Sequence, residues 1–183
     1  MDFNPAHVLR DQMDAEKVCQ ERLREIATST LLTGEERAGV LAQADEEILH
    51  EQAFEAVLEQ YGGRAAGEAG RETVHSLIEK GRTALPEPAL RVADFRVVER
   101  FMRPVMKSAR ELFRAIGDEQ AVKAYDMILH DEESHVEFNR NLFNRLKTSA
   151  IGEAIKARWS SLRSDHYAKP YFRRALAGVK TGS

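Results

Sequence analysis

Apolar residues recur at steps of three and four along most of the chain, which is the spacing of one face of an α-helix. This pattern predicts four long helices, at roughly residues 5–30, 34–61, 89–116 and 119–147. A shorter fifth helix, from residue 149 to about residue 162, follows the fourth. No run of alternating β-branched residues predicts a strand. We therefore expect an all-α fold.

Capping residues mark the ends of these helices. Asn4 followed by Pro5 is typical of an N-cap and a first helical residue. The segment 33–36 (TGEE) matches a capping box, and the glycines at 62–63 and 117 indicate helix ends. The turns between the first and second helices and between the third and fourth are short. Each of these pairs is therefore predicted to be antiparallel.

A long connection, from Gly62 to about Pro88, separates the two helix pairs, and residues 72–80 within it have the pattern of a short helix. Four helices with one long crossover form a standard topology. We predict an antiparallel four-helix bundle over residues 1–148. Residues 149–183 form a second region, with the short fifth helix and a basic tail.

Two of the inward-facing stripes carry a glutamate followed three residues later by a histidine. These pairs are Glu47 with His50 and Glu132 with His135. Residues three apart on a helix project to the same side, so one helix can offer a carboxylate and an imidazole to one metal ion. A single pair of this kind arises easily by chance. The repetition in both helix pairs makes the pattern specific.

The other two inward stripes are apolar except for one glutamate each, Glu16 and Glu99. Counted from the two short turns, these glutamates lie at about the same height as the Glu-x-x-His pairs. Four buried carboxylates would repel one another strongly unless cations compensate them, and two divalent ions balance their charge. Carboxylate and imidazole ligands suit iron or manganese. The predicted metal ligands are Glu16, Glu47, His50, Glu99, Glu132 and His135.

The composition limits the kinds of site and the cellular location that we expect. Cys19 is the only cysteine, which excludes an intramolecular disulfide and any site that needs several thiolates. The N-terminus lacks the plan of a signal peptide, and no stretch is apolar enough to span a membrane, so we expect a cytoplasmic protein. The net charge is only −3, but the tail from Lys147 onward carries about +6.

The segments 45–51 (DEEILHE) and 131–137 (DEESHVE) resemble the paired metal motifs of the ferritin-like superfamily, bacterioferritin and rubrerythrin in particular. The resemblance covers roughly residues 5–147. It implies a di-iron carboxylate bundle in which the six candidates have distinct roles. The bridging ligands would be Glu47 and Glu132, the terminal carboxylates Glu16 and Glu99, and the histidines His50 and His135, one for each metal.

Our first expectation for function is a non-haem di-iron oxidoreductase that activates O2 or peroxide, with an unidentified substrate and an electron donor. The alternative within the same superfamily is iron oxidation and storage. A third reading is a metal-free helical interaction module whose basic tail contacts nucleic acid or an anionic surface. The long crossover and Pro104, which is expected to kink the third helix beside Glu99, favour a monomer or small homo-oligomer over a cage subunit.

Overall fold

The structure, a computed structural model, describes residues 4–63 and 85–164, without the side chains of residues 99–101 and 163–164. Every regular element in these ranges is helical, which confirms the all-α prediction. The elements are α1 (Pro5–Ala27), α2 (Gly34–Leu58), α4 (Arg91–Ala115), α5 (Glu119–Leu146), α6 (Gly152–Ser164) and the short 3-10 helices η1 (Glu59–Tyr61) and η4 (Pro88–Leu90). The helix predicted at 72–80 and most of the basic tail lie outside the described residues.

The predicted caps are present. At the start of α2, the Thr33 backbone N–H donates to Glu36 Oε2 (2.9 Å) and the Glu36 N–H donates to Thr33 Oγ1 (3.2 Å), which completes the capping box. Gly117 has a φ of 78°, a conformation that glycine adopts without strain, and it ends the turn after α4. Asp118 then caps α5 by accepting a hydrogen bond from the N–H of Ala121 (2.9 Å).

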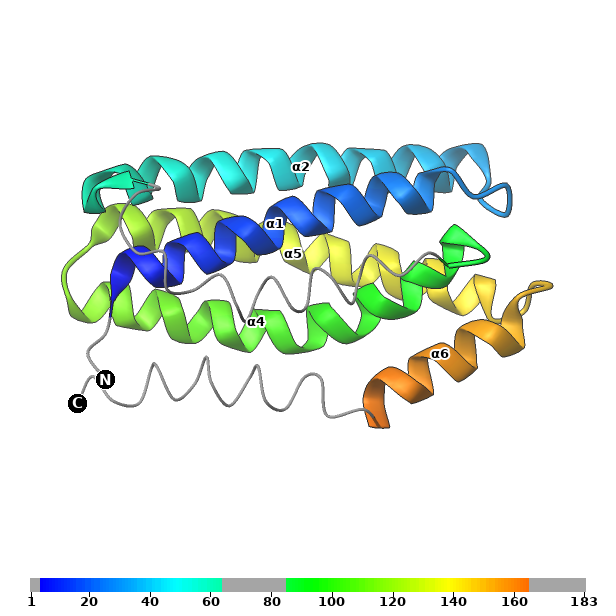
Figure 1. The fold of residues 1–183 in the computed structure, drawn as a ribbon. Helices are drawn as coiled ribbons and strands as arrows, with labels where there is room; N and C mark the ends of the chain where they lie inside the picture. Colours follow the sequence, from blue (N-terminus) through cyan, green and yellow to red (C-terminus); the bar gives the residue numbers. More distant parts are fainter. Residues whose placement is uncertain (1–3, 64–84, 165–183) are drawn as a thin grey trace.

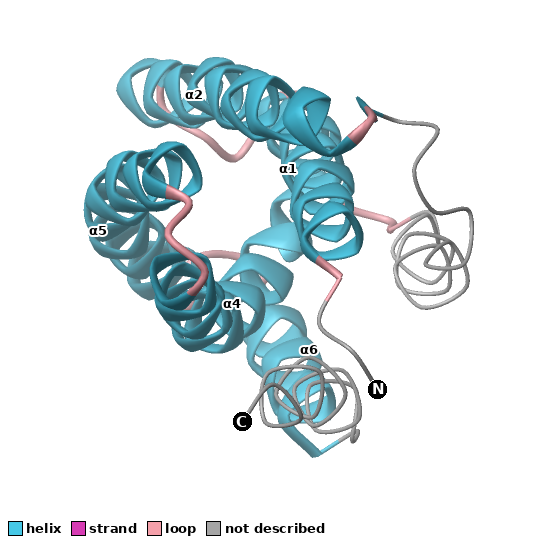
Figure 2. Ribbon diagram, turned by 90° about the vertical axis from the view of Figure 1, so that its left-hand side faces the viewer, coloured by secondary structure: helices cyan, strands magenta, loops and turns pink. Residues whose placement is uncertain are grey.

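Four long helices lie side by side around a common interior (Figures 1 and 2). Going around the interior in Figure 2, α2 neighbours α1 and α5, and α4 neighbours the same two helices. In Figure 1, α1 and α5 run in one direction and α2 and α4 in the other. The end of α2 and the start of α4 therefore lie at opposite ends of the molecule, which agrees with a long connection between them. None of the described helices is long and apolar enough to cross a lipid bilayer.

The start of α2 is also tied to the end of α5. Arg145 donates from Nη2 to Glu36 Oε2 (2.7 Å) and to the carbonyl of Leu31 (3.0 Å), and its Nε also pairs with Glu36. Partial burial opposes ionisation of Glu36, but the hydrogen bonds from Thr33 and Arg145 outweigh it and lower the pKa of Glu36. This pair fixes the relative position of the two helices that carry the Glu-x-x-His motifs.

A second close approach between α2 and α5 depends on Gly39. A Cβ atom at this position would collide with Cε2 of Phe138. Because this is far inside van der Waals contact, any larger residue at 39 would have to displace the phenylalanine ring or the helix. Gly39 therefore permits the spacing of the two helices two turns away from Glu47.

The buried apolar side chains form two clusters rather than one. The first cluster includes Leu23, Val40, Phe95, Leu142 and Ile155, and the second includes Leu9, Phe54, Phe113, Tyr125 and Leu129. Between them lies a layer of buried polar side chains: Glu16, Gln43, Glu47, His50, Glu132, His135 and Asn139. On α5, for example, this layer occupies the positions between Leu129 and Leu142. The interior is therefore interrupted at mid-length by groups that are costly to bury without partners.

Helix α6 covers the outer side of α4 and buries a group of charges there. Arg91 is 1% exposed and donates to Glu25 Oε2 (2.8 Å) and Asp94 Oδ2 (3.3 Å). Arg158 of α6 donates to both oxygens of Asp94, at 2.5 and 2.6 Å. Asp94 lies off the inward stripe of α4, yet it is buried because α6 packs over it. The proposed division at residue 148 stays a prediction.

Candidate metal centre

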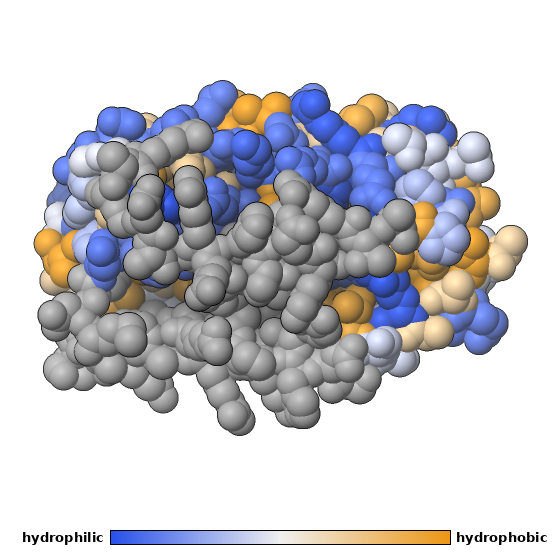
Figure 3. All heavy atoms as spheres, in the orientation of Figure 1, coloured by the Kyte–Doolittle hydropathy of each residue, from blue (hydrophilic) through white to orange (hydrophobic). Residues whose placement is uncertain are grey.

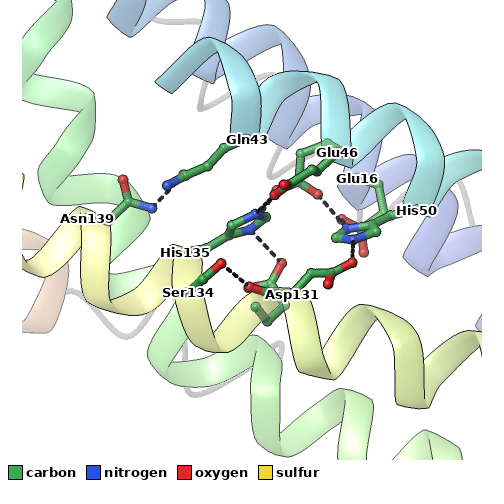
Figure 4. A network of polar contacts seen from close by, with 10 residues as sticks. Glu16, Gln43, Glu46, His50, Asp131, Ser134, His135 and Asn139 are labelled. Atoms are coloured by element: carbon green, nitrogen blue, oxygen red, sulfur yellow. Dashed lines mark hydrogen bonds and ion pairs between the residues drawn. The ribbon is translucent and has the colours of Figure 1, made fainter. Parts of the chain in front are cut away.

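Five of the six predicted ligands have described side chains, and all five are buried in the polar layer (Figure 4). Glu16 is on α1, Glu47 and His50 are on α2, and Glu132 and His135 are on α5; their exposed fractions are 2%, 3%, 1%, 8% and 3%. Four of them, Glu16, Glu47, His50 and Glu132, each offer one ligand atom, and these atoms lie within 4.8 Å of one another. This group can hold a metal ion.

His135 lies beside this group of four. Its Nδ1 is 3.4 Å from Glu132 Oε1 and 3.7 Å from Glu47 Oε1. The other oxygen of Glu47, Oε2, is 3.1 Å from Nδ1 of His50, and the two imidazole centroids are 6.0 Å apart. Glu47 thus presents one oxygen to each histidine. A carboxylate that bridges two ions needs this placement.

Glu99 lies in α4, the helix that completes the interior, but its side chain is outside the described part of the structure. Its role as a ligand stays a prediction. The members of the group of four come from α1, α2 and α5, so a ligand from α4 would add to them.

Two further carboxylates lie beside the outer ring nitrogens, Nε2, of the two histidines. The sequence pattern did not identify them. Nε2 of His50 lies 3.3 Å from Asp131 Oδ2, and Nε2 of His135 lies 2.5 Å from Glu46 Oε2. Each of these acids immediately precedes the Glu of the motif on the opposite helix. In both motifs an acidic residue directly precedes the ligand glutamate, and this order is the sequence feature that could have identified the two acids. A carboxylate on the outer nitrogen fixes the imidazole ring and leaves Nδ1 directed at the interior.

Burial and proximity shift the ionisation of these groups strongly. Burial and the neighbouring Glu47 raise the pKa of Glu16 well above its usual value. Burial also opposes ionisation of Glu47, but hydrogen bonds from His50 and Glu16 outweigh it and lower the pKa of Glu47. Burial disfavours a charged His135, yet Glu132 and Glu46 outweigh it and raise its pKa to about 9. Without a metal ion, bound protons therefore offset the negative charge of the carboxylates.

One acceptor in this layer has no partner among the residues that the structure describes. Oε1 of Glu16 is buried and receives no hydrogen bond from any described residue. A buried carboxylate oxygen without a partner is costly, and native structures normally supply a partner, a water or an ion. The unpartnered oxygen and the tight group of ligand atoms therefore fit a cation-binding role.

A buried amide pair closes the polar layer on the side of the first apolar cluster. Nδ2 of Asn139 donates to Oε1 of Gln43 at 3.0 Å, and the two residues are 2% and 5% exposed. Asn139 lies one turn after His135 on α5, and Gln43 lies one turn before Glu47 on α2; Figure 4 shows the pair beside His135. This hydrogen bond links α2 and α5 beside the site.

No protein-family model matches this chain, and no curated protein or solved structure is significantly similar to it. The chemistry of the site must therefore be argued from its own residues. Three carboxylates and two imidazoles in one buried layer offer oxygen and nitrogen donors to a metal ion.

Proposed function

We propose that this chain is a non-haem di-iron oxidoreductase that activates O2 or peroxide, built as a ferritin-like four-helix bundle. The observation that carries the proposal is the buried group of Glu16, Glu47, His50 and Glu132, whose ligand atoms lie within 4.8 Å of one another. A mid-bundle site formed by two Glu-x-x-His motifs and two further glutamates is the arrangement of di-iron carboxylate proteins.

Charge favours two ions over one. With Glu99 included, four carboxylates surround the site, and two divalent cations neutralise them while both histidines remain neutral. In this assignment His50 and Glu16 belong to one ion and His135 and Glu99 to the other. Glu47, which faces both histidines, is shared. Manganese is the alternative metal, since it accepts the same ligands.

The residues of the chain prepare the site for redox chemistry. Asp131 and Glu46 accept hydrogen bonds from the outer nitrogens of the histidines, so each ring keeps its orientation and tautomer. The apolar clusters on both sides exclude bulk water from the polar layer. Two irons bound by these residues would supply electron transfer and Lewis acidity, which the protein side chains lack. An external electron donor is required to return the irons to the ferrous state.

Metal analysis combined with a size measurement tests the proposal. The protein is loaded anaerobically with ferrous iron, exposed to air or peroxide, and desalted. We expect O2 or peroxide consumption and about two irons per chain in a small particle. Retention of tens of irons per chain in a particle of hundreds of kilodaltons would support the storage alternative instead. Absence of bound metal would reject both.

Variants assign the ligands. Glu47→Ala or Glu132→Ala should reduce the metal content from about two ions per chain to one or none, because the proposal makes both residues ligands that the two ions share. Glu111→Ala is the control, since Glu111 is an exposed glutamate on α4 that pairs with the nearby Arg110 and Arg114. Full occupancy in both test variants would show that the assignment is wrong.

A further inference from the structure

Gln12 is a buried glutamine on α1 whose polarity no contact between described residues explains. It is 2% exposed, and its Oε1 receives no hydrogen bond from any described residue. Most other polar residues of α1 and α2 are exposed or half-buried, and Figure 3 shows many hydrophilic side chains on the upper part of the molecule, where these helices run. An amide oxygen is costly to bury alone, and native proteins normally supply it with a donor, a water or an ion.

Gln12 lies where the second apolar cluster meets the polar layer. It precedes Glu16 by one helical turn, so the two side chains project from the same side of α1. Leu9 and Met13, on either side of it, belong to the second apolar cluster and do not require a polar neighbour. Oε1 of Glu16 has no described partner either. Two buried oxygens, one turn apart on the same helix, therefore lack a partner.

The antiparallel packing of α1 and α2 places Gln12 toward the end of the site where His50 lies. The two helices run in opposite directions (Figure 1). Gln12 precedes Glu16 by four residues and His50 follows Glu47 by three, so both are displaced toward the same end of the bundle, by about 6 and 4.5 Å. Oε2 of Glu16 is 3.9 Å from Nδ1 of His50. Gln12 is therefore on the side of the site that these two residues form.

We propose that Gln12 is a further ligand of the metal centre, whose side-chain oxygen binds the ion that Glu16 and His50 hold. The inference rests on the proposed metal centre. One cation there gives both unpartnered oxygens a partner, and carbonyl oxygen is a donor that suits hard divalent ions such as manganese. The amide is neutral, so the balance between four carboxylates and two divalent ions is unchanged. Helix α1 then contributes two donors one turn apart, much as α2 and α5 do.

The variant Gln12→Leu tests this assignment, because leucine fills a similar volume and offers no oxygen. Its metal-free Tm should rise by roughly 2–12 °C, since no unpartnered amide is then buried. In anaerobic titrations with ferrous iron, one of the two ions should bind about 10-fold or more weakly, because even the outer partners of metal ligands have effects of this size. Gln52→Leu, at an exposed glutamine on α2, is the control and should change neither quantity.

Cobalt(II) as a probe gives a readout that a purely structural role would not change. Its visible absorption bands depend on the number and kind of atoms bound to the ion. The spectrum of the cobalt-loaded protein should therefore change in Gln12→Leu and stay the same in Gln52→Leu. Gln12→Glu keeps an oxygen at the same position, so this variant should retain the iron affinity that Gln12→Leu loses.

Failure of this assignment is distinguishable from failure of the proposed function. A wild-type protein that binds no metal would reject both. A wild type that binds two ions, together with a Gln12→Leu variant of unchanged iron affinity and cobalt spectrum, would reject Gln12 as a ligand and leave the metal centre standing. A weaker affinity accompanied by a lower metal-free Tm would also overturn the assignment, because the amide would then act by holding α1 in place.

Discussion

Replacement of Glu16 by glutamine should have two effects of opposite sign if this residue binds metal. Glu16 is 2% exposed, and its Oε1 has no partner among the described residues. In the metal-free protein burial and the neighbouring Glu47 and Glu132 disfavour the charged form of Glu16, so folding at neutral pH has to protonate it, which costs stability. Glutamine keeps the shape of the side chain and is neutral without taking up a proton. The metal-free variant should therefore be more stable than wild type, while its affinity for iron falls.

The two effects can be given magnitudes. Relief of an electrostatically strained site position typically adds about 0.5–2 kcal/mol to the free energy of unfolding. For a chain of 183 residues, each kcal/mol raises Tm by about 2–4 °C, so the metal-free Tm should rise by roughly 1–8 °C. Ferrous iron at about 100 times its dissociation constant stabilises wild type by about 2.7 kcal/mol. The corresponding rise in Tm is roughly 5–11 °C.

In the variant, an affinity loss of about 100-fold leaves iron near its dissociation constant at the same concentration, where the stabilisation is only about 0.4 kcal/mol. The iron-induced rise should then shrink to roughly 1–2 °C. Anaerobic thermal melts followed by circular dichroism, with chelator or with iron, measure both quantities. Glu21→Gln is the matched control, an exposed glutamate on the same helix. If Glu16→Gln lowers the metal-free Tm and leaves the iron-induced rise intact, Glu16 is structural and our reasoning is refuted.

Three other predictions concern the helices that carry the site. Glu36→Gln should lower the free energy of unfolding by about 1–2 kcal/mol at pH 7. Because the pKa of Glu36 is lowered in the folded protein, the difference from wild type should vanish as the pH falls below 4.5, the ordinary pKa of a glutamate. Glu35→Gln is the control and should show neither effect. Gly39→Ala should lower Tm through overpacking of about 1–3 kcal/mol, whereas Gly34→Ala, whose Cβ meets nothing within 4 Å, should not. Asp131→Asn should weaken iron binding about 10–100-fold in anaerobic titrations, with the helical content unchanged.

Local physical chemistry explains why the helices could be predicted closely. Capping residues and helical periodicity act within a few residues of the chain, and α2 and α5 begin at the predicted positions. The largest difference at a helix end is three residues; α1, for example, ends at Ala27 rather than at residue 30. The inward stripes were predictable for the same reason, because a polar residue on an otherwise apolar face is visible in one helix alone.

Contacts between helices were harder to predict from the sequence. Asp131 and Glu46 hold the histidines of the opposite helix, and this pairing depends on how α2 and α5 are rotated against each other. Asp94 lies off the inward stripe of α4, yet it is buried, because α6 covers that side of the helix and Arg158 pairs with it. Periodicity identifies which residues share a face of one helix, and it carries no information on what a later helix packs against that face.

The division of the core into two clusters gives a physical reason why the chain can tolerate a costly polar layer. Each cluster includes side chains from all four long helices: Leu23, Val40, Phe95 and Leu142 in one, and Leu9, Phe54, Phe113 and Tyr125 in the other. The helices are therefore packed together on both sides of the site, and each fully buried side chain contributes about 1.5–3 kcal/mol to that packing. Because the helices are fixed at both ends, the carboxylates between them cannot separate to relieve their repulsion. Protons relieve it in the metal-free protein, and cations would do so without requiring any helix to move.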